Sequence, residues 1–421
     1  MINESLSHRI AFRRLILLSL WVLCAVLGAR LANAQLRVDI TSGVTDPIPV
    51  AVAPFVGDPR DTAGVIAADL GGSGRFRTTS RSAADYLVTG QVIAADAKSL
   101  TIQFELRNLL TNQVVLRERV DATPSIWRQA AHRISDRVHL KILGIRSAFA
   151  TRIAYVSVDG PVTQRRYRLV VADSDGESPR IILESKQPLM SPVWSPDGQS
   201  LAYVSFESQR SAVYVQTLRT AERRRVSSRA GVNGAPAFSP DGRRLALTLS
   251  SRDGNLDIHV LDLQTGALER LTDHPAIDTE PAWSVDGSRI LFTSDRAGGP
   301  QIYEMEARPQ ARARRLSFQG AYNARPRVSP DGRTLAFVTR EGAAYRIAKQ
   351  DVQSGTLQIL TTGSQDESPS FSPAGSMLIY ATREAGRSVL ATVSVDGLTR
   401  ARLQSERGEV REPTWGPLPA E

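Results

Sequence analysis

Aspartates recur at regular spacing through the second half of the chain and are the first groups to consider for chemistry. They are Asp197, Asp241, Asp286 and Asp331. A ring of carboxylates could bind a metal ion. Each one, however, lies in Ser-Pro-Asp-Gly or Ser-Val-Asp-Gly, in which aspartate bonds to nearby backbone and glycine closes a type I turn. We therefore interpret these aspartates as turn residues.

Histidines are the next candidates for catalysis or metal binding. Those after the N-terminal segment are His132, His139, His259 and His274. No pair has the spacing of a zinc site, and the helical pattern around His132 and His139 predicts that both face solvent. The sequence also lacks the Gly-x-Ser-x-Gly elbow of α/β-hydrolases. We expect no catalytic residue, no metal site and no cofactor.

A repeat of about 45 residues organises the chain after residue 150. Its marker is a proline followed by x-aromatic-Ser-Pro-Asp-Gly or a variant, with steps of 43 to 45 residues between Pro192, Pro236, Pro281, Pro326, Pro369 and Pro413. An alternating apolar strand follows each turn, for example 201–204 and 290–293. Two further strands complete each repeat, such as 256–261 and the segment ending at Thr272. Four strands in about 45 residues are typical of a β-propeller blade.

The two ends of the repeat region complete each other. Residues 153–157 match the strand after a turn but have no Pro-x-Trp strand before them, whereas Pro413-Thr414-Trp415 is that strand with no partner after it. We therefore expect six blades over residues 152–421, with the last strand closing the ring against the first blade and leaving no open edge. Trp194, Trp283 and Trp415 are expected in the blade cores.

Residues 35–148 show no such repeat and predict a small α/β domain. Strands are expected at 49–56, 86–93, 100–106 and 114–120, and a helix at 62–70. A longer helix is expected from Pro124 to Gly144, with Thr123 as its cap and one apolar stripe. Residues 35–46 have weak strand alternation and predict a mobile arm.

The first 34 residues have the organisation of a secretory signal peptide. Arginines precede an apolar run at 15–27, and Ala32-Asn33-Ala34 is a small-x-small cleavage pattern, so cleavage is expected between Ala34 and Gln35. The run is too short for a comfortable membrane span. The Arg13-Arg14 pair leaves the twin-arginine route open, although the apolar core favours Sec export.

Charge alone suggests a weaker hypothesis. The 421 residues carry 52 Lys and Arg against 43 Asp and Glu, a net charge of +9. A basic balance can indicate nucleic acid or another polyanion as a partner. Because the arginines are scattered along the chain, we expect no nucleic-acid partner.

Together, the signal peptide, the α/β domain and the six blades resemble the TolB family, the periplasmic propellers of the Tol-Pal system. The repeat is shared with other exported propellers, including those of prolyl oligopeptidases. More specific segments similar to the family are 187–192, 206–208, 233–236, 347–351 and 151–156. The implied organisation is a signal peptide over 1–34, an α/β domain over 35–148 and a six-bladed propeller with TolB-type (PD40) repeats over 152–421.

The resemblance implies two partner sites. An N-terminal arm would bind the C-terminal domain of TolA, and its residues here are Gln35, Leu36, Arg37, Val38, Asp39, Ile40, Thr41, Ser42, Gly43, Val44, Thr45 and Asp46. The propeller mouth would bind Pal, the peptidoglycan-associated lipoprotein, through loops entering the innermost strands. The matching positions are Met190, Ser191, Asn233, Gly234, Thr279, Glu280, Asp366 and Glu367. In one departure from the family, Val232 replaces the usual histidine before Asn-Gly-Ala-Pro.

The resemblance therefore implies a non-enzymatic periplasmic scaffold, expected as a monomer, that supports outer-membrane integrity and constriction at cell division. It would reach membranes only through its partners, with other outer-membrane proteins as further contacts. Without the resemblance, Glu280 and Glu367 would be ordinary loop carboxylates. The alternative is an exported propeller enzyme, a hydrolase or lyase with its active site at the channel mouth, which would need converging histidines and carboxylates.

Overall fold

The fold is described from a computed structural model, which covers residues 38–40, 46–95, 98–251, 254–403 and 408–419. The expected signal peptide and its cleavage site lie outside these residues, as do Gln35, Leu36, Arg37 and Thr41 to Thr45 of the expected arm. Within the described part, no helix is long and apolar enough to cross a membrane.

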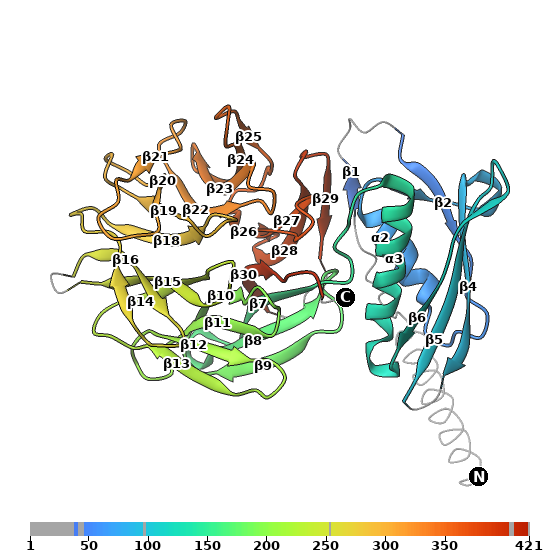
Figure 1. The fold of residues 1–421 in the computed structure, drawn as a ribbon, viewed down its shortest axis with the longest axis horizontal. Helices are drawn as coiled ribbons and strands as arrows, with labels where there is room; N and C mark the ends of the chain where they lie inside the picture. The colour runs from blue at the N-terminus through green and yellow to red at the C-terminus, as the bar shows by residue number, and fades with distance from the viewer. Residues whose placement is uncertain (1–37, 41–45, 96–97, 252–253, 404–407, 420–421) are drawn as a thin grey trace, which may run out of the picture. The chain divides into compact units, whose positions relative to one another are not determined.

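An α/β layer precedes the propeller (Figure 1). Its five-stranded sheet has the order β3-β2-β4-β5-β6, with β2 parallel to β3 and β4 and the other pairs antiparallel. Two helices pack together against it and share its apolar core. The elements are β2 (Ile48–Val52), α2 (Thr62–Gly72), β3 (Phe76–Thr78), β4 (Tyr86–Ala95), β5 (Leu100–Asn108), β6 (Gln113–Ala122) and α3 (Trp127–Leu143), with short 3-10 turns at Arg81–Ala83 and Pro124–Ile126.

The start of α3 differs from the sequence prediction. Pro124–Ile126 forms a 3-10 turn, and the helix proper begins after Ile126 with no side-chain cap. The prediction that Thr123 caps it was wrong, because its hydroxyl bonds to Ser125 instead. The helix ends where expected, since Gly144 takes a left-handed φ of 71° and returns its N–H to Leu140, a conformation that glycine accepts without strain.

Six antiparallel sheets form the blades, each with its first-written strand innermost. They are β30 (Glu409–Trp415), β7 (Arg152–Asp159), β8 (Arg166–Asp173), β9 (Arg180–Ser185); β10 (Leu189–Trp194), β11 (Ser200–Ser205), β12 (Ala212–Thr217), β13 (Arg223–Ser227); β14 (Asn233–Phe238), β15 (Arg244–Ser250), β16 (Leu256–Asp262), β17 (Leu268–Arg270); β18 (Asp278–Trp283), β19 (Arg289–Ser294), β20 (Gln301–Glu306), β21 (Arg314–Arg315); β22 (Asn323–Val328), β23 (Thr334–Glu341), β24 (Ala344–Asp351), β25 (Leu357–Ile359); and β26 (Glu367–Phe371), β27 (Met377–Glu384), β28 (Arg387–Ser394), β29 (Thr399–Arg402).

The six-bladed prediction is confirmed, and so is the ring closure. The C-terminal β30 pairs antiparallel with β7, with Trp415 opposite Ile153. Trp415 also donates from Nε1 to the Thr151 hydroxyl at 2.8 Å and from its amide to Ser370 at 3.0 Å. Trp194 and Trp283 are buried as predicted. The two ends of the propeller sequence therefore hold one another in register.

The aspartates of the repeat are turn residues. In the first repeat Gly198 N–H bonds to the Ser195 carbonyl at 2.9 Å, and the Asp197 carboxylate accepts the Ser195 hydroxyl at 2.5 Å and the Gln199 amide at 3.0 Å. The same Ser-to-Asp bond recurs at Asp241, Asp286 and Asp331. Each carboxylate is thus committed to its own hairpin.

A short strand extends the sixth blade. β1 (Val38–Ile40) pairs antiparallel with β29, with the backbone of Asp39 opposite Arg400. A segment of the expected arm therefore adds a fifth strand to this sheet. Asp46, the last arm residue, is exposed.

Candidate functional site: the propeller mouth

Each innermost strand carries a bulge at one repeated position. The residue directly before the repeat proline has a left-handed φ of 44° to 58°, and at each bulge the strand register shifts. We call these residues the bulge ring: Ser191, Ala235, Glu280, Arg325, Ser368 and Glu412. A left-handed non-glycine residue costs about 1 kcal/mol, and a β-bulge redirects side chains. Because all six strands carry this unfavourable conformation, we infer that the direction in which the bulges point these side chains is functional.

All six residues of the bulge ring line one cavity of about 680 Å³. The cavity also reaches Met190, Val232, Asn233, Gly234 and Thr279. Met190 and Val232 are exposed apolar side chains, with 39% and 43% of their surface accessible. Exposed apolar groups at the rim of a concave site are the features expected of a docking surface.

Two carboxylates of the bulge ring hold the next blade in place. Glu280 accepts the Arg325 guanidinium Nε–H at 2.8 Å and the Arg325 amide at 2.9 Å, together with the Thr293 hydroxyl at 2.9 Å. Glu412 accepts the Ser191 amide at 2.7 Å and the Ser191 hydroxyl at 3.1 Å. Arg325 also donates to the Ser368 hydroxyl. The acidic groups of this cavity therefore connect adjacent blades.

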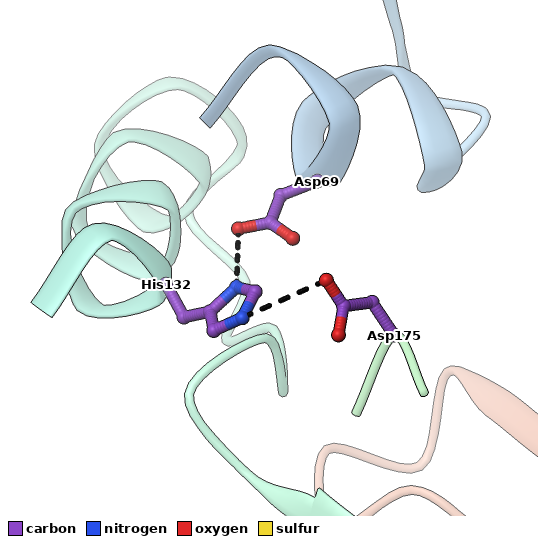
Figure 2. Close-up of side chains that lie close together, drawn as sticks. All are labelled: Asp69, His132 and Asp175. Atoms are coloured by element: carbon purple, nitrogen blue, oxygen red, sulfur yellow. Dashed lines mark hydrogen bonds and ion pairs between the residues drawn. The ribbon is translucent and has the colours of Figure 1, made fainter. Parts of the chain in front are cut away.

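A second polar cluster joins α3 to the turn after β8 (Figure 2). His132 donates from Nδ1 to Asp69 of α2 at 2.8 Å, while its Nε2 lies 3.9 Å from Asp173 and 3.8 Å from Asp175. Arg128 forms an ion pair with Asp175 at 2.5 Å. The prediction that His132 and His139 face solvent was wrong, because their exposures are 0% and 5%.

The charges of this cluster favour a protonated histidine. Burial lowers the pKa of His132, but Asp69, Asp175 and Asp173 outweigh that effect and raise it to about 9. Burial raises the pKa values of Asp69 and Asp173. Asp69, His132 and Asp175 offer atoms close enough to hold a metal ion, yet Asp175 already has Arg128 as its cation and Asp69 already has His132. We therefore interpret the cluster as an ion-pair network.

Both the N-terminal domain and the propeller of this chain are similar to known proteins. The family model for the TolB beta propeller domain (PD40) matches residues 139–419, and the model for the TolB amino-terminal domain matches 36–84. The Tol-Pal system protein TolB of Methylococcus capsulatus is 51% identical over 407 residues, covering 91% of this chain and 95% of its own. The chain belongs to the TolB family.

Other TolB proteins are also similar to this chain in sequence and in structure. The Tol-Pal system protein TolB of Alcanivorax borkumensis is 48% identical over 424 residues, covering 95% of each chain. The crystal structure of TolB from Acinetobacter baumannii superposes with a TM-score of 0.84 at 40% identity, over 91% of this chain and all of that one. TolB proteins are periplasmic components of the Tol-Pal system, and this chain has their fold.

The mouth residues implied by the TolB resemblance fall into two groups. Met190, Ser191, Asn233, Gly234, Thr279 and Glu280 all line the cavity, whereas Asp366 and Glu367 are not among its lining residues. Asn233 and Asp366 are fully buried; Asn233 accepts the Ser227 hydroxyl at 2.6 Å, and Asp366 accepts the Thr382 hydroxyl at 2.5 Å. Except for Asp366, which lies directly before β26, these residues lie on strands rather than in the expected loops. Their role in binding stays a prediction.

Four charged lining residues were missed from the sequence: Arg210, Arg325, Arg327 and Glu412. The signal was present, because Arg325 and Glu412 occupy the same repeat position as Glu280, directly before the proline. Superposing the six repeats on one another would have identified the whole ring.

Proposed function

We propose that this chain is a non-enzymatic periplasmic scaffold whose propeller mouth docks Pal and whose N-terminal arm binds TolA. The observation that carries the proposal is the cavity into which six bulges turn their side chains, in a chain that belongs to the TolB family. By binding both partners, the protein would link the outer membrane, through Pal, to the energised inner membrane, through TolA. We propose that this link is used in envelope constriction.

The chemistry of the cavity supports docking over catalysis. Its two carboxylates, Glu280 and Glu412, are held by amides and hydroxyls of neighbouring blades. A general base must be free to take a proton from substrate. Rim residues such as Met190 and Val232 instead offer apolar area to a protein partner, with polar groups beside them.

The arm is proposed to act by strand addition. Main-chain hydrogen bonds to a sheet edge provide affinity without a preformed pocket, and β1 is paired with β29 in this way. While β1 is paired with β29, the edge of β1 that forms this pairing is closed to TolA. If Pal binding favours either the paired or the released arm, it changes the affinity for TolA by some factor. Linkage then requires that TolA binding change the affinity for Pal by the same factor.

Hydrogen exchange of the chain from Gln35, with and without the soluble Pal domain, tests the docking site. We expect Pal to slow exchange in β10, β14 and β18 and to leave the outer strands β13, β17 and β21 unchanged. Protection confined to the outer strands would exclude the mouth. Titration of the TolA C-terminal domain into Pal-free and Pal-saturated protein then measures the coupling, and a variant lacking residues 35–46 should lose TolA binding only.

A further inference from the structure

A second ring of positions lies two residues beyond the bulge ring on each innermost strand. Its members are Val193, Ala237, Ala282, Arg327, Ser370 and Thr414. Five of them are uncharged and none of those five is long. Arg327 alone is a long cation, and it lines the cavity together with Val193 and Thr414. Nothing in the blade fold requires an arginine there, because the other five blades form without one.

Most N–H groups of the Arg327 guanidinium have no acceptor among the described residues. Nη1 donates to the carbonyl of the adjacent Pro326 at 2.8 Å. Among the described residues, no carboxylate lies within ion-pair distance of it, and this one neutral acceptor is its only side-chain hydrogen bond. The guanidinium has five N–H donors and no acceptor.

The carboxylates that could have neutralised Arg327 are committed to other groups. Glu280 is paired with Arg325 at 2.8 Å, and Glu412 is held by Ser191 at 2.7 Å. Enclosing an unpaired cation destabilises the folded chain. Burial and the neighbouring Arg325 lower the pKa of Arg327 to about 10, so it remains charged at neutral pH. Glu280 and Glu412 line the same cavity and act on Arg327 from a distance, but neither forms an ion pair with it. Among the described residues, the cation of Arg327 is therefore left without a directly bonded carboxylate.

We propose that Arg327 binds a carboxylate of the partner that docks at the mouth, an aspartate or glutamate side chain that enters the channel. This inference rests on the proposed docking of Pal. A carboxylate matches the planar fork of arginine, since two parallel N–H···O bonds can form. Single charges enclosed at an interface contribute strongly to specificity, because a partner without the carboxylate leaves the arginine unpaired.

The test compares Arg327→Met with Arg333→Met by calorimetric titration of the soluble Pal domain. Arg333 is an exposed residue of the same blade that does not line the cavity, so both variants lose one charge. Arg327→Met should weaken binding at least about 10-fold, and Arg333→Met by less than about 2-fold. The affinity of Arg327→Lys for the Pal domain should lie between those of the wild-type protein and Arg327→Met, because lysine keeps the positive charge but lacks the planar fork of N–H donors.

Thermal unfolding separates this role from a structural one. If Arg327 only supported the fold, Arg327→Met would lower Tm; the proposal expects a Tm equal to or above that of the unsubstituted protein, since an unpaired cation has been removed. In double-mutant cycles against amide substitutions of the Pal acidic residues, one carboxylate should couple to Arg327. Wild-type binding that Arg327→Met leaves unchanged would overturn this inference alone. Absence of Pal binding by the wild-type protein would overturn the docking proposal together with it.

Discussion

The Glu280 carboxylate binds both the backbone amide and the guanidinium of Arg325, at 2.9 Å and 2.8 Å, across 45 residues of sequence. One side chain therefore fixes the bulge of the next blade and neutralises its arginine. The resemblance to TolB implies that Glu280 contacts a partner. The structure shows that Glu280 also has a structural role, because it connects two blades of the propeller. Substituting it changes the shape of the mouth as well as its charge.

Glu280→Ala should destabilise the fold by about 2 kcal/mol, because it removes the carboxylate paired with the Arg325 guanidinium and leaves Arg325 only the hydroxyls of Thr293 and Ser368 as acceptors. Urea unfolding followed by tryptophan fluorescence measures the change. Glu341→Ala is the matched control: its ion pair with Arg346 is 52% exposed on the Glu341 side, so a loss below about 1 kcal/mol is expected. Equal losses for the two variants would contradict the inter-blade role of Glu280.

His132 should make stability depend on pH above neutrality. Its pKa is raised from 6.5 to about 9 in the folded chain. The stabilisation from its proton is therefore complete below pH 6.5 and is lost as the pH rises through 9. Between these limits the wild-type protein should lose on the order of 2 kcal/mol relative to His132→Gln.

His259 is the control for that experiment. Burial lowers its pKa, so its contribution is lost as the pH falls, and His259→Gln should run parallel to wild type above pH 7. A wild-type curve parallel to that of His132→Gln from pH 6.5 to 9 would show that His132 is not protonated in the folded chain.

Trp415 should be the most sensitive residue of the ring closure. Trp415→Ala removes partly buried ring area and the Nε1 hydrogen bond to Thr151, and we expect a loss of about 3 kcal/mol. Trp415→Phe keeps an aromatic ring and loses the Nε1 hydrogen bond, so about 1 kcal/mol is expected. Denaturant midpoints measured at fixed protein concentration give both values. Identical losses would mean that the ring area contributes nothing to closure.

The repeat aspartates should behave as turn residues. Hydrogen bonds from Ser284 and Ser288 lower the pKa of Asp286 to about 2. Asp286→Ala should lower the Tm through loss of these bonds, and chelation of divalent cations should leave the Tm of the wild-type protein unchanged. A Tm that falls with chelator in wild type but not in Asp286→Ala would restore the metal interpretation of these carboxylates.

The parts of the fold written in local sequence were predictable. Each Ser-Pro-Asp-Gly turn depends on four adjacent residues, and the repeat period gave the blades and the closing strand. The burial of His132 was not predictable in this way, because its neighbours Asp173 and Asp175 come from the propeller, more than 40 residues along the chain.

The site was predictable only in part, for a physical reason. Left-handed φ is expected of glycine, and the bulge ring contains none. Its conformation follows from blade packing around the channel, which no single residue type announces. The resemblance to TolB indicated the mouth, whereas the roles of Arg325 and Glu412 depend on contacts between blades.

The most direct test of the docking proposal is calorimetric titration of the soluble Pal domain into wild-type protein, Val232→Ser and Val285→Ser. Both valines are exposed, by 43% and 49%, but only Val232 lines the cavity. Burying a valine at an interface is worth about 1.5 kcal/mol, so Val232→Ser should bind roughly tenfold more weakly while Val285→Ser matches wild type. Equal affinities for all three proteins, or loss only in Val285→Ser, would contradict docking at the propeller mouth.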